Sequence, residues 1–273
     1  MTFQGFSGLK KRRSDLKLLM CLTGPNEAFS TLLLSFTHFC LSHIFCADAR
    51  STDRNRFPLL LKVFHSTLRE QFGSSLLLTV AVSGPPTISK AAYDADFIRM
   101  NRYVDLVQVM NYDFHIFSYF HPFVGFNAPL RRIRAELGVV GKMNSEASMH
   151  TWAEMGLWRN KTIFGIPTYG RGFRLVNWRV NKPYSMATGP VDDITNYPQV
   201  ATYSLKRRPH SFAGTDKLWL SFEDVRSVKA KANYAKSLEI AGIMVYHIGS
   251  DDVYGTCGNG TFPLLTAIKE VLQ

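Results

Sequence analysis

The sequence predicts an α/β protein of the (β/α) barrel type with an incomplete set of strands. Three observations carry this prediction. Apolar, β-rich runs alternate with segments of helical periodicity, the runs are apolar almost throughout, and no GxGxxG follows any of them. Alternation implies parallel βαβ units, and continuous apolar strands imply cover on both faces. An open dinucleotide-binding sheet therefore has no support.

Five apolar runs are expected to form strands. They cover residues 16–22, 76–82, 104–110, 163–167 and 241–248. Short apolar runs bounded by Gly, Pro or polar turn residues are typical of buried strands. A complete barrel of this type needs eight strands, so the predicted set is incomplete.

Helical spacing of apolar residues marks the segments between and after these runs. The expected helices cover residues 57–72, 94–100, 145–158, 222–238 and 263–271. Ser221 stands immediately before the fourth helix and has a side chain suited to an N-cap. Strands and helices thus follow one another along most of the chain.

Two segments are less clear, and the second of them breaks the alternation. Residues 39–47 would make a sixth strand, although their β pattern is poor. Residues 175–219 are polar, rich in Pro and Asn, and long enough for a small inserted lobe. We therefore predict a single domain over residues 1–273, with a reduced lobe inserted at 175–219.

Composition narrows the classes of partner and cofactor. The 273 residues carry a net charge of +11, but Lys and Arg are spread along the chain and match no nucleic-acid motif. A solvated basic surface explains this charge without a nucleic-acid partner. The four cysteines form no CxxC and lie near no close His pair. We expect no metal site and no cofactor.

The sequence offers no membrane span and no leader that can be identified. Residues 32–47 are apolar, but they contain His38 and His43 and fall short of the ~20 residues that a span needs. The first eight residues are too short and polar for a signal peptide. Two glycosylation sequons begin at Asn160 and Asn259, which is a hint of secretion.

Polar groups follow three of the predicted strands, where barrels carry their functional residues. The first group is Met110-Asn111-Tyr112-Asp113. Strand alternation places Gln108, Met110 and Tyr112 on one face. If this face is the barrel interior, the Tyr112 hydroxyl points into its mouth and Asp113 offers a carboxylate at the rim.

The second group covers residues 167–171 and includes Tyr169 and Arg171, and the third is Tyr246-His247 with Asp251 and Asp252 beyond it. The segment 114–126 adds six aromatic residues. Aromatic rings beside a few hydrogen-bonding groups suit a sugar, whose C–H faces stack while its hydroxyls need partners. The alternative is that these rings fill the core.

At this point the residues resemble a known family, the glycoside hydrolases of family 18. The matching stretches are residues 14–33, AAYD (91–94), VDLVQVMNYDFH (104–115), GFNAPL (125–130), GIPTYGRGF (165–173) and AGIMVYHIGSDDVYGTCGNGTFPLL (241–265). They resemble the family's third, sixth, seventh and eighth strand regions in order, and the third carries an altered turn at residues 22–25. The resemblance implies a (β/α)8 TIM-barrel, with residues 175–219 as an α+β lobe after the seventh strand.

The resemblance also implies a function. Family 18 contains chitinases and chitinase-like proteins, so it implies chitin or a chitooligosaccharide as the partner, an extracellular location and a monomer. The family's hydrolysis needs the motif DxxDxDxE, whose final Glu is the catalytic acid. Residues 34–57, where this motif should lie, contain Asp48 and Asp53 and no Glu. Asp48 is the only local candidate for the acid, so no hydrolysis is expected.

Six residues match the family's sugar-facing positions: Met110, Tyr112, Asp113, Tyr169, Arg171 and Tyr246. Tyr112 resembles the Tyr that bonds the substrate's N-acetyl group, and Asp113 a substrate-binding Asp. Met110 resembles a pocket residue, while Tyr169 and Arg171 fall at the seventh-strand rim. Tyr246 stands where the family has a Trp that floors the pocket. Cys257 lacks its usual family partner near Tyr203.

Three hypotheses follow. The first is a chitinase-like protein that binds N-acetylglucosamine oligomers without cutting them. The second is an active chitinase, working by substrate-assisted retaining hydrolysis, with a displaced acid such as Asp48. The third is a truncated or mis-spliced product that does not fold stably, because a barrel without all its strands exposes sheet edges, which invites aggregation. We favour the first.

Overall fold

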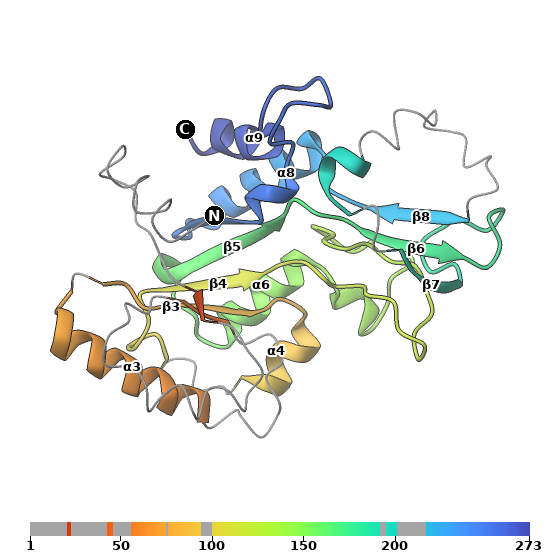
Figure 1. The fold of residues 1–273 in the computed structure, drawn as a ribbon. Helices are drawn as coiled ribbons and strands as arrows, with labels where there is room; N and C mark the ends of the chain where they lie inside the picture. Colours follow the sequence, from red (N-terminus) through yellow and green to blue (C-terminus); the bar gives the residue numbers. More distant parts are fainter. Residues whose placement is uncertain are drawn as a thin grey trace.

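The computed structural model shows a parallel sheet accompanied by helices, with a separate antiparallel sheet at one side (Figure 1). It describes residues 21–22, 43–45, 56–74, 76–93, 100–191, 195–200 and 217–273. Asp48 and Asp53 lie outside these residues. So do residues 16–20 of the first predicted strand and 94–99 of the second predicted helix.

Among the described residues, the main sheet has six strands, all parallel. They are β1 (Cys21–Leu22), β2 (His43–Phe45), β3 (Thr79–Ser83), β4 (Leu106–Met110), β5 (Thr162–Pro167) and β9 (Gly242–Tyr246). Each strand pairs with the next strand of this sheet in chain order. The strand order therefore has no reversal of the kind that defines a doubly wound sheet. β2 falls within residues 39–47, where a sixth strand was predicted. Within the described residues, β1 and β9 are the edges of this sheet.

In the part of the chain that the structure describes, five α-helices accompany the strands: α3 (Arg56–Phe72), α4 (Pro86–Ala92), α6 (Ser145–Glu154), α8 (Val225–Ser237) and α9 (Pro263–Leu272). Short 3-10 turns lie at η2 (Val140–Lys142), η3 (Arg159–Lys161) and η4 (Ile248–Ser250). α3 and α9 occupy the predicted segments. α4 was not predicted, because the proline pair at its start was taken only as a turn; proline is nevertheless favourable in a helix's first turn.

The prediction that Ser221 caps α8 is wrong. Ser221 is the last residue of strand β8, and its hydroxyl accepts a hydrogen bond from the Asn127 N–H. Asp224 is the N-cap instead: its side chain accepts from the Ser227 N–H while the Ser227 hydroxyl accepts from the Asp224 N–H. This reciprocal pair satisfies two donors at the helix start, so α8 begins three residues later than predicted.

A three-stranded antiparallel sheet occupies the region predicted as a lobe. Its strands are β6 (Arg171–Leu175), β7 (Ala187–Val191) and β8 (Leu218–Ser221), in the order β7-β6-β8. They enclose a small core of Val124, Phe173, Leu175, Ala187 and Trp219. The sheet begins at Arg171, so the predicted site residue Arg171 lies on a lobe strand.

The two faces of the parallel sheet have different neighbours. Val107 and Val109 belong to the large core shared with the helices. Met110 and Tyr112 belong instead to a small cluster with Ala81 and Ala128. Met110 and Tyr112 therefore share one face, on the side away from the helix-covered core. This alternation carries the site residues to one side of the sheet.

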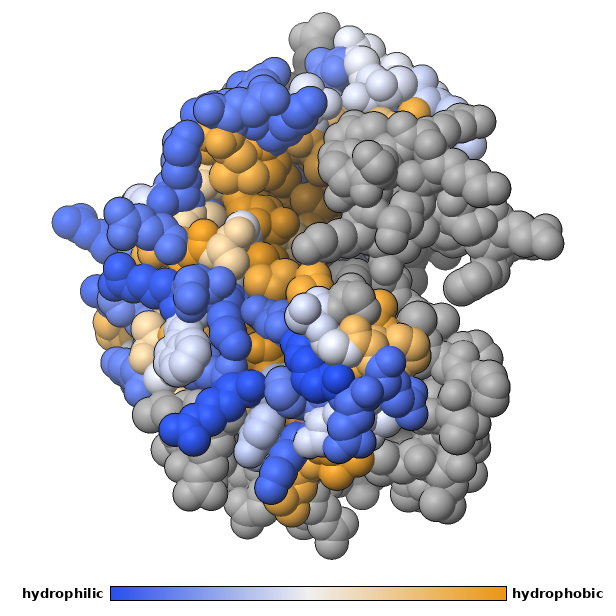
Figure 2. All heavy atoms as spheres, turned by 90° about the vertical axis from the view of Figure 1, so that its left-hand side faces the viewer, coloured by the Kyte–Doolittle hydropathy of each residue, from blue (hydrophilic) through white to orange (hydrophobic). Residues whose placement is uncertain are grey.

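Figure 2 shows the face at the left of Figure 1, where hydrophilic side chains cover much of the surface and apolar side chains gather in its upper part. None of the described helices is both long and apolar enough to cross a membrane.

Gly84 is expected to tolerate no side chain. A Cβ there would lie 2.1 Å from the Met110 carbonyl oxygen, a backbone atom that cannot move aside cheaply. We expect Gly84→Ala to lower the free energy of unfolding by about 1–3 kcal/mol, measured by denaturant titration. Gly189→Ala is the matched control, because a Cβ at Gly189 meets nothing within 4 Å. Equal stability of the two variants would contradict the close approach of β3 and β4.

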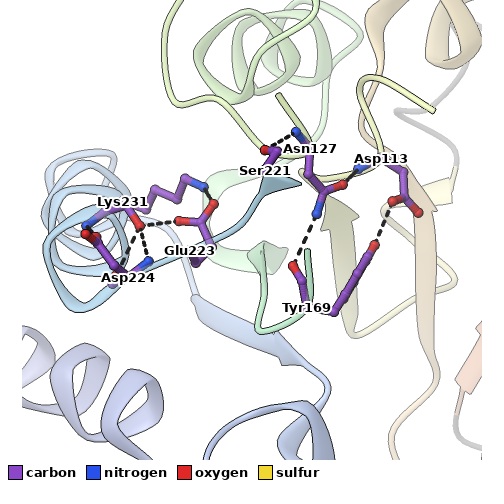
Figure 3. A network of polar contacts seen from close by, with 8 residues as sticks. Asp113, Asn127, Tyr169, Ser221, Glu223, Asp224 and Lys231 are labelled. Atoms are coloured by element: carbon purple, nitrogen blue, oxygen red, sulfur yellow. Dashed lines mark hydrogen bonds and ion pairs between the residues drawn. The ribbon is translucent and has the colours of Figure 1, made fainter. Parts of the chain in front are cut away.

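A buried ion pair lies beside the lobe. Glu223 and Lys231 bond each other, and their side chains are 7 % and 4 % exposed. Figure 3 shows the Glu223 and Lys231 side chains pointing toward each other, and Ser227 Oγ also donates to Glu223 Oε2 at 2.7 Å. Burial lowers the pKa of Lys231, while the Glu223 carboxylate acts in the opposite direction. The pair joins the start of α8 to its middle turns.

Candidate functional site

A cavity of ≈ 580 Å³ opens at the carboxyl ends of β3, β4, β5 and β9. The six predicted site residues all line it: Met110, Tyr112, Asp113, Tyr169, Arg171 and Tyr246. They come from distant parts of the chain, and the parallel strands bring them together because all these strands end at the same edge. The volume lies within the range of small-molecule sites.

Three tyrosine rings form one wall. The rings of Tyr112 and Tyr246 stack with centroids 5.9 Å apart and planes at 22°. Tyr169 meets both edge-on, at 5.8 Å from Tyr112 and 6.2 Å from Tyr246. Tyr112 is 5 % exposed and Tyr246 47 % exposed. Tyr246 therefore presents an open ring, which Tyr112 supports from within.

Tyr112 is held by the neighbouring strand. A Cβ at Gly165 of β5 would lie 3.2 Å from Tyr112 Cε1 and 2.5 Å from the Val109 carbonyl oxygen. Glycine at this position therefore lets the ring pack against the β5 backbone. Burial, and then the nearby Asp113 charge, raise the pKa of Tyr112. Its phenol remains protonated and, within the described residues, its hydroxyl has no hydrogen-bond partner.

Asp113 carries the carboxylate of the site. Its Oδ1 accepts hydrogen bonds from Tyr169 Oη at 2.8 Å and from Arg171 Nε at 2.8 Å, and Arg171 Nη2 lies 2.7 Å from the same oxygen. Burial and the Asp113 charge raise the pKa of Tyr169, so this phenol donates. Within the described residues Oδ2 accepts no hydrogen bond. Protein groups thus fix one carboxylate oxygen, Oδ1, while Oδ2 keeps its capacity to accept a hydrogen bond.

A hydrogen-bonded rim closes the cavity beside β9. Ser250 Oγ donates to Asn196 Oδ1 at 2.9 Å and lies 2.9 Å from His247 Nε2. Thr168 holds the backbone here, because its hydroxyl donates to the His247 carbonyl oxygen at 2.6 Å. The rim offers polar groups that suit sugar hydroxyls.

The Asp251-Asp252 pair of the third predicted cluster serves the backbone. Asp251 Oδ2 accepts from the Leu265 N–H at 3.0 Å, at the start of α9. Asp252 accepts from the N–H groups of Thr256 at 2.9 Å and Cys257 at 2.7 Å. Burial alone would raise the pKa of Asp252, but these hydrogen bonds outweigh it and the pKa lies below its ordinary value. Both side chains are buried and neither lines the cavity.

Other lining residues were not predicted, including Ser83, Gly84 and Pro85 at the end of β3. The strand-end rule that found the three polar clusters applies equally to this strand and would have found them. Asn196 and Ser250 follow no strand directly and carry no such signal. Asn127, which lies behind the lining, belongs to GFNAPL (125–130), but its residue type alone gave it no role.

Among the described residues that line the cavity, Asp113 has the only carboxyl group. Its Oδ1 accepts hydrogen bonds from the Arg171 guanidinium and the Tyr169 phenol, so this oxygen is an acceptor and not a donor. Asp48, the predicted substitute acid, lies outside the described residues. The described arrangement can stack a ring and satisfy hydroxyls, but it includes no carboxylic acid placed to protonate a leaving group.

Sequence comparison identifies the family. The sequence model of glycosyl hydrolases family 18 matches residues 41–251. Chitotriosidase-1 of Mus musculus is 32 % identical over 242 residues, which cover 82 % of this chain and 51 % of that protein. An oviduct-specific glycoprotein of Papio anubis is 28 % identical over 311 residues, covering 98 % and 48 %. The chain spans about half the length of these relatives.

Structural comparison gives the fold. The Group IV chitinase of Ostrinia furnacalis superimposes with a TM-score of 0.81 at 27 % identity, over 99 % of this chain and 83 % of that one. Human YKL-39, a pseudo-chitinase with retained chitooligosaccharide binding, gives a TM-score of 0.84 at 22 % identity, over 98 % and 84 %. The likeness confirms the predicted TIM-barrel class, and the family match covers most of the sequence. This chain belongs to glycoside hydrolase family 18, among the chitinases and chitinase-like proteins.

Proposed function

We propose that this protein binds chitin or N-acetylglucosamine oligomers in the cavity without hydrolysing them. The observation that carries the proposal is that residues suited to binding a sugar are present while the motif needed to hydrolyse it is missing. Six residues that match the family's sugar-facing positions line one cavity, while the sequence has no register for DxxDxDxE between residues 34 and 57. The protein therefore combines a retained binding surface with a missing acid.

A sugar would stack one face on the open ring of Tyr246, which is 47 % exposed. The protonated Tyr112 hydroxyl donates to an N-acetyl carbonyl oxygen, and Asp113 Oδ2 accepts from a hydroxyl or amide N–H. Arg171 and Tyr169 keep Asp113 in place. A ring contact plus converging donors and acceptors is the usual design of a small-ligand site.

We expect no hydrolysis because the reaction needs a proton donor for the leaving oxygen. Cleavage of a glycosidic bond requires a titratable acid within hydrogen-bond reach of the leaving oxygen. Asp48 has a shorter side chain than the family's Glu and a different sequence context. The fold is shared with human YKL-39, a pseudo-chitinase, which supports the compatibility of this fold with binding alone.

We also propose an extracellular monomer, following the family resemblance. Both sequon asparagines, Asn160 and Asn259, are exposed in the structure, which would permit glycans on a folded secreted protein.

Retention on chitin beads tests the proposal. We expect the protein to be retained and to be released by chitotetraose but not by cellotetraose, which lacks N-acetyl groups. Tyr246→Ala should weaken retention about tenfold, as expected for loss of a ring contact worth ~1.5 kcal/mol. Tyr254→Ala is the matched control, because Tyr254 is 87 % exposed and does not line the cavity. Equal release by both sugars, or equal loss in both variants, would contradict a specific site.

A further inference from the structure

Asn127 lies at the junction of three segments of the site. It is 1 % exposed. Its backbone N–H donates to Ser221 Oγ at 2.8 Å at the end of β8, and its carbonyl oxygen accepts from the Phe114 N–H at 3.0 Å. The residue thus ties the chain after β4 to the lobe.

The side chain of Asn127 reaches two site residues. Its Oδ1 accepts from the Asp113 N–H at 3.0 Å, and its Nδ2 donates to the Tyr169 carbonyl oxygen at 3.3 Å (Figure 3). The side chains of Asp113 and Tyr169 are themselves bonded. One amide therefore holds the backbones of both partners in the hydrogen bond that fixes the site's carboxylate.

Asp113 needs such support because its backbone is left-handed, with φ at 58°. This conformation is uncommon for residues other than glycine; aspartate adopts it more readily than most, and here hydrogen bonds from the surrounding chain hold it. The N–H groups of Asp113 and Phe114 both donate to Asn127. Two successive hydrogen bonds to one residue keep this turn, and with it the direction of the Asp113 side chain.

We infer that Asn127 is a positioning residue, which holds Asp113 so that Oδ1 meets Arg171 and Tyr169 while Oδ2 stays open to the sugar. The inference rests on the proposed sugar-binding function for its consequence in affinity, but not for its effect on Asp113. An amide suits this place because it supplies one acceptor and one donor at the same distance from the backbone. Alanine supplies neither, and aspartate keeps only the acceptor.

The first test needs no ligand. The Arg171 Nε–H resonance in a ¹⁵N spectrum of the whole chain reports its bond to Asp113. Asn127→Ala should move this resonance, because the acceptor for the Asp113 N–H and the donor to the Tyr169 carbonyl oxygen are both lost. An unchanged resonance in folded Asn127→Ala would overturn the inference. If Asn127→Ala does not melt cooperatively, Asn127→Ser takes its place, since its hydroxyl falls short of the Asp113 N–H.

The second test is a double-mutant cycle with chitotetraose. Asn127→Ala should weaken binding about tenfold, which is the effect expected when the sugar loses one hydrogen bond to the charged Asp113 carboxylate. In the Asp113→Ala background the same change should have little further effect, because the two residues act through one group. Additive losses would show that Asn127 only supports the fold and would overturn the inference. If the wild type binds no chitotetraose, the proposed function fails, while the Arg171 resonance still decides the positioning role.

Discussion

Replacing Tyr112 with alanine is expected to weaken chitotetraose binding at least about a hundredfold, or ~3 kcal/mol. The change removes two contributions at once. The hydroxyl is protonated, because burial and the Asp113 charge raise its pKa, and Tyr112 lines the cavity. The ring also supports Tyr246, with centroids 5.9 Å apart. Isothermal titration of both proteins with chitotetraose measures the effect.

Tyr112→Phe separates the two contributions. It keeps the ring, and so keeps the stack with Tyr246 and the contact with the β5 backbone at Gly165. We expect a loss of about tenfold from the missing hydroxyl alone, with an unchanged melting temperature. Because Tyr112 is buried, alanine also leaves a cavity that costs stability, and the phenylalanine variant remains informative if alanine unfolds the protein. Wild-type affinity in Tyr112→Phe would contradict a role for the hydroxyl.

Replacing Lys231 with methionine is expected to lower the free energy of unfolding by about 3–5 kcal/mol. The side chains of Lys231 and Glu223 are 4 % and 7 % exposed, so the substitution leaves a buried carboxylate with Ser227 Oγ as its remaining side-chain partner. An unpaired buried charge is among the costliest single changes in a protein. Urea unfolding followed by circular dichroism measures the loss.

Two further variants control this result. Lys229→Met lies on the same helix, and its ion pair with Glu270 is exposed, so a change within about 1 kcal/mol is expected. The double variant Glu223→Leu with Lys231→Met removes both charges and should recover much of the stability. A loss in Lys231→Met no larger than in Lys229→Met would contradict the burial of the pair.

The sequence was informative where a structural period repeats. Apolar runs located β3, β4, β5 and β9 of the main sheet, because burial on both faces leaves a continuous pattern. The ends of three strands then supplied Met110, Tyr112, Asp113, Tyr169 and Tyr246, which the structure brings to one cavity. This prediction succeeded because parallel strands end at a common edge, so residues that directly follow different strands lie close together in the fold.

It was less informative where contacts are made between segments without a period. Asn127 acts through a backbone N–H of Asp113 and a carbonyl of Tyr169, and no local pattern marks such bonds. Ser221 was assigned to a helix cap because its residue type suits one, while its place in β8 depends on pairing with β6. Arg171 was placed at a rim, but it reaches the cavity from a lobe strand.

The most direct test of the central claim is isothermal titration of the whole chain with chitotetraose. The account predicts saturable heats that return to the baseline after each injection, because the sugar is bound and not cut. A continuing heat of hydrolysis after each injection, abolished by Asp48→Asn, would show that the protein is an active chitinase with a displaced acid. The absence of any saturable heat would show that the cavity does not bind the sugar.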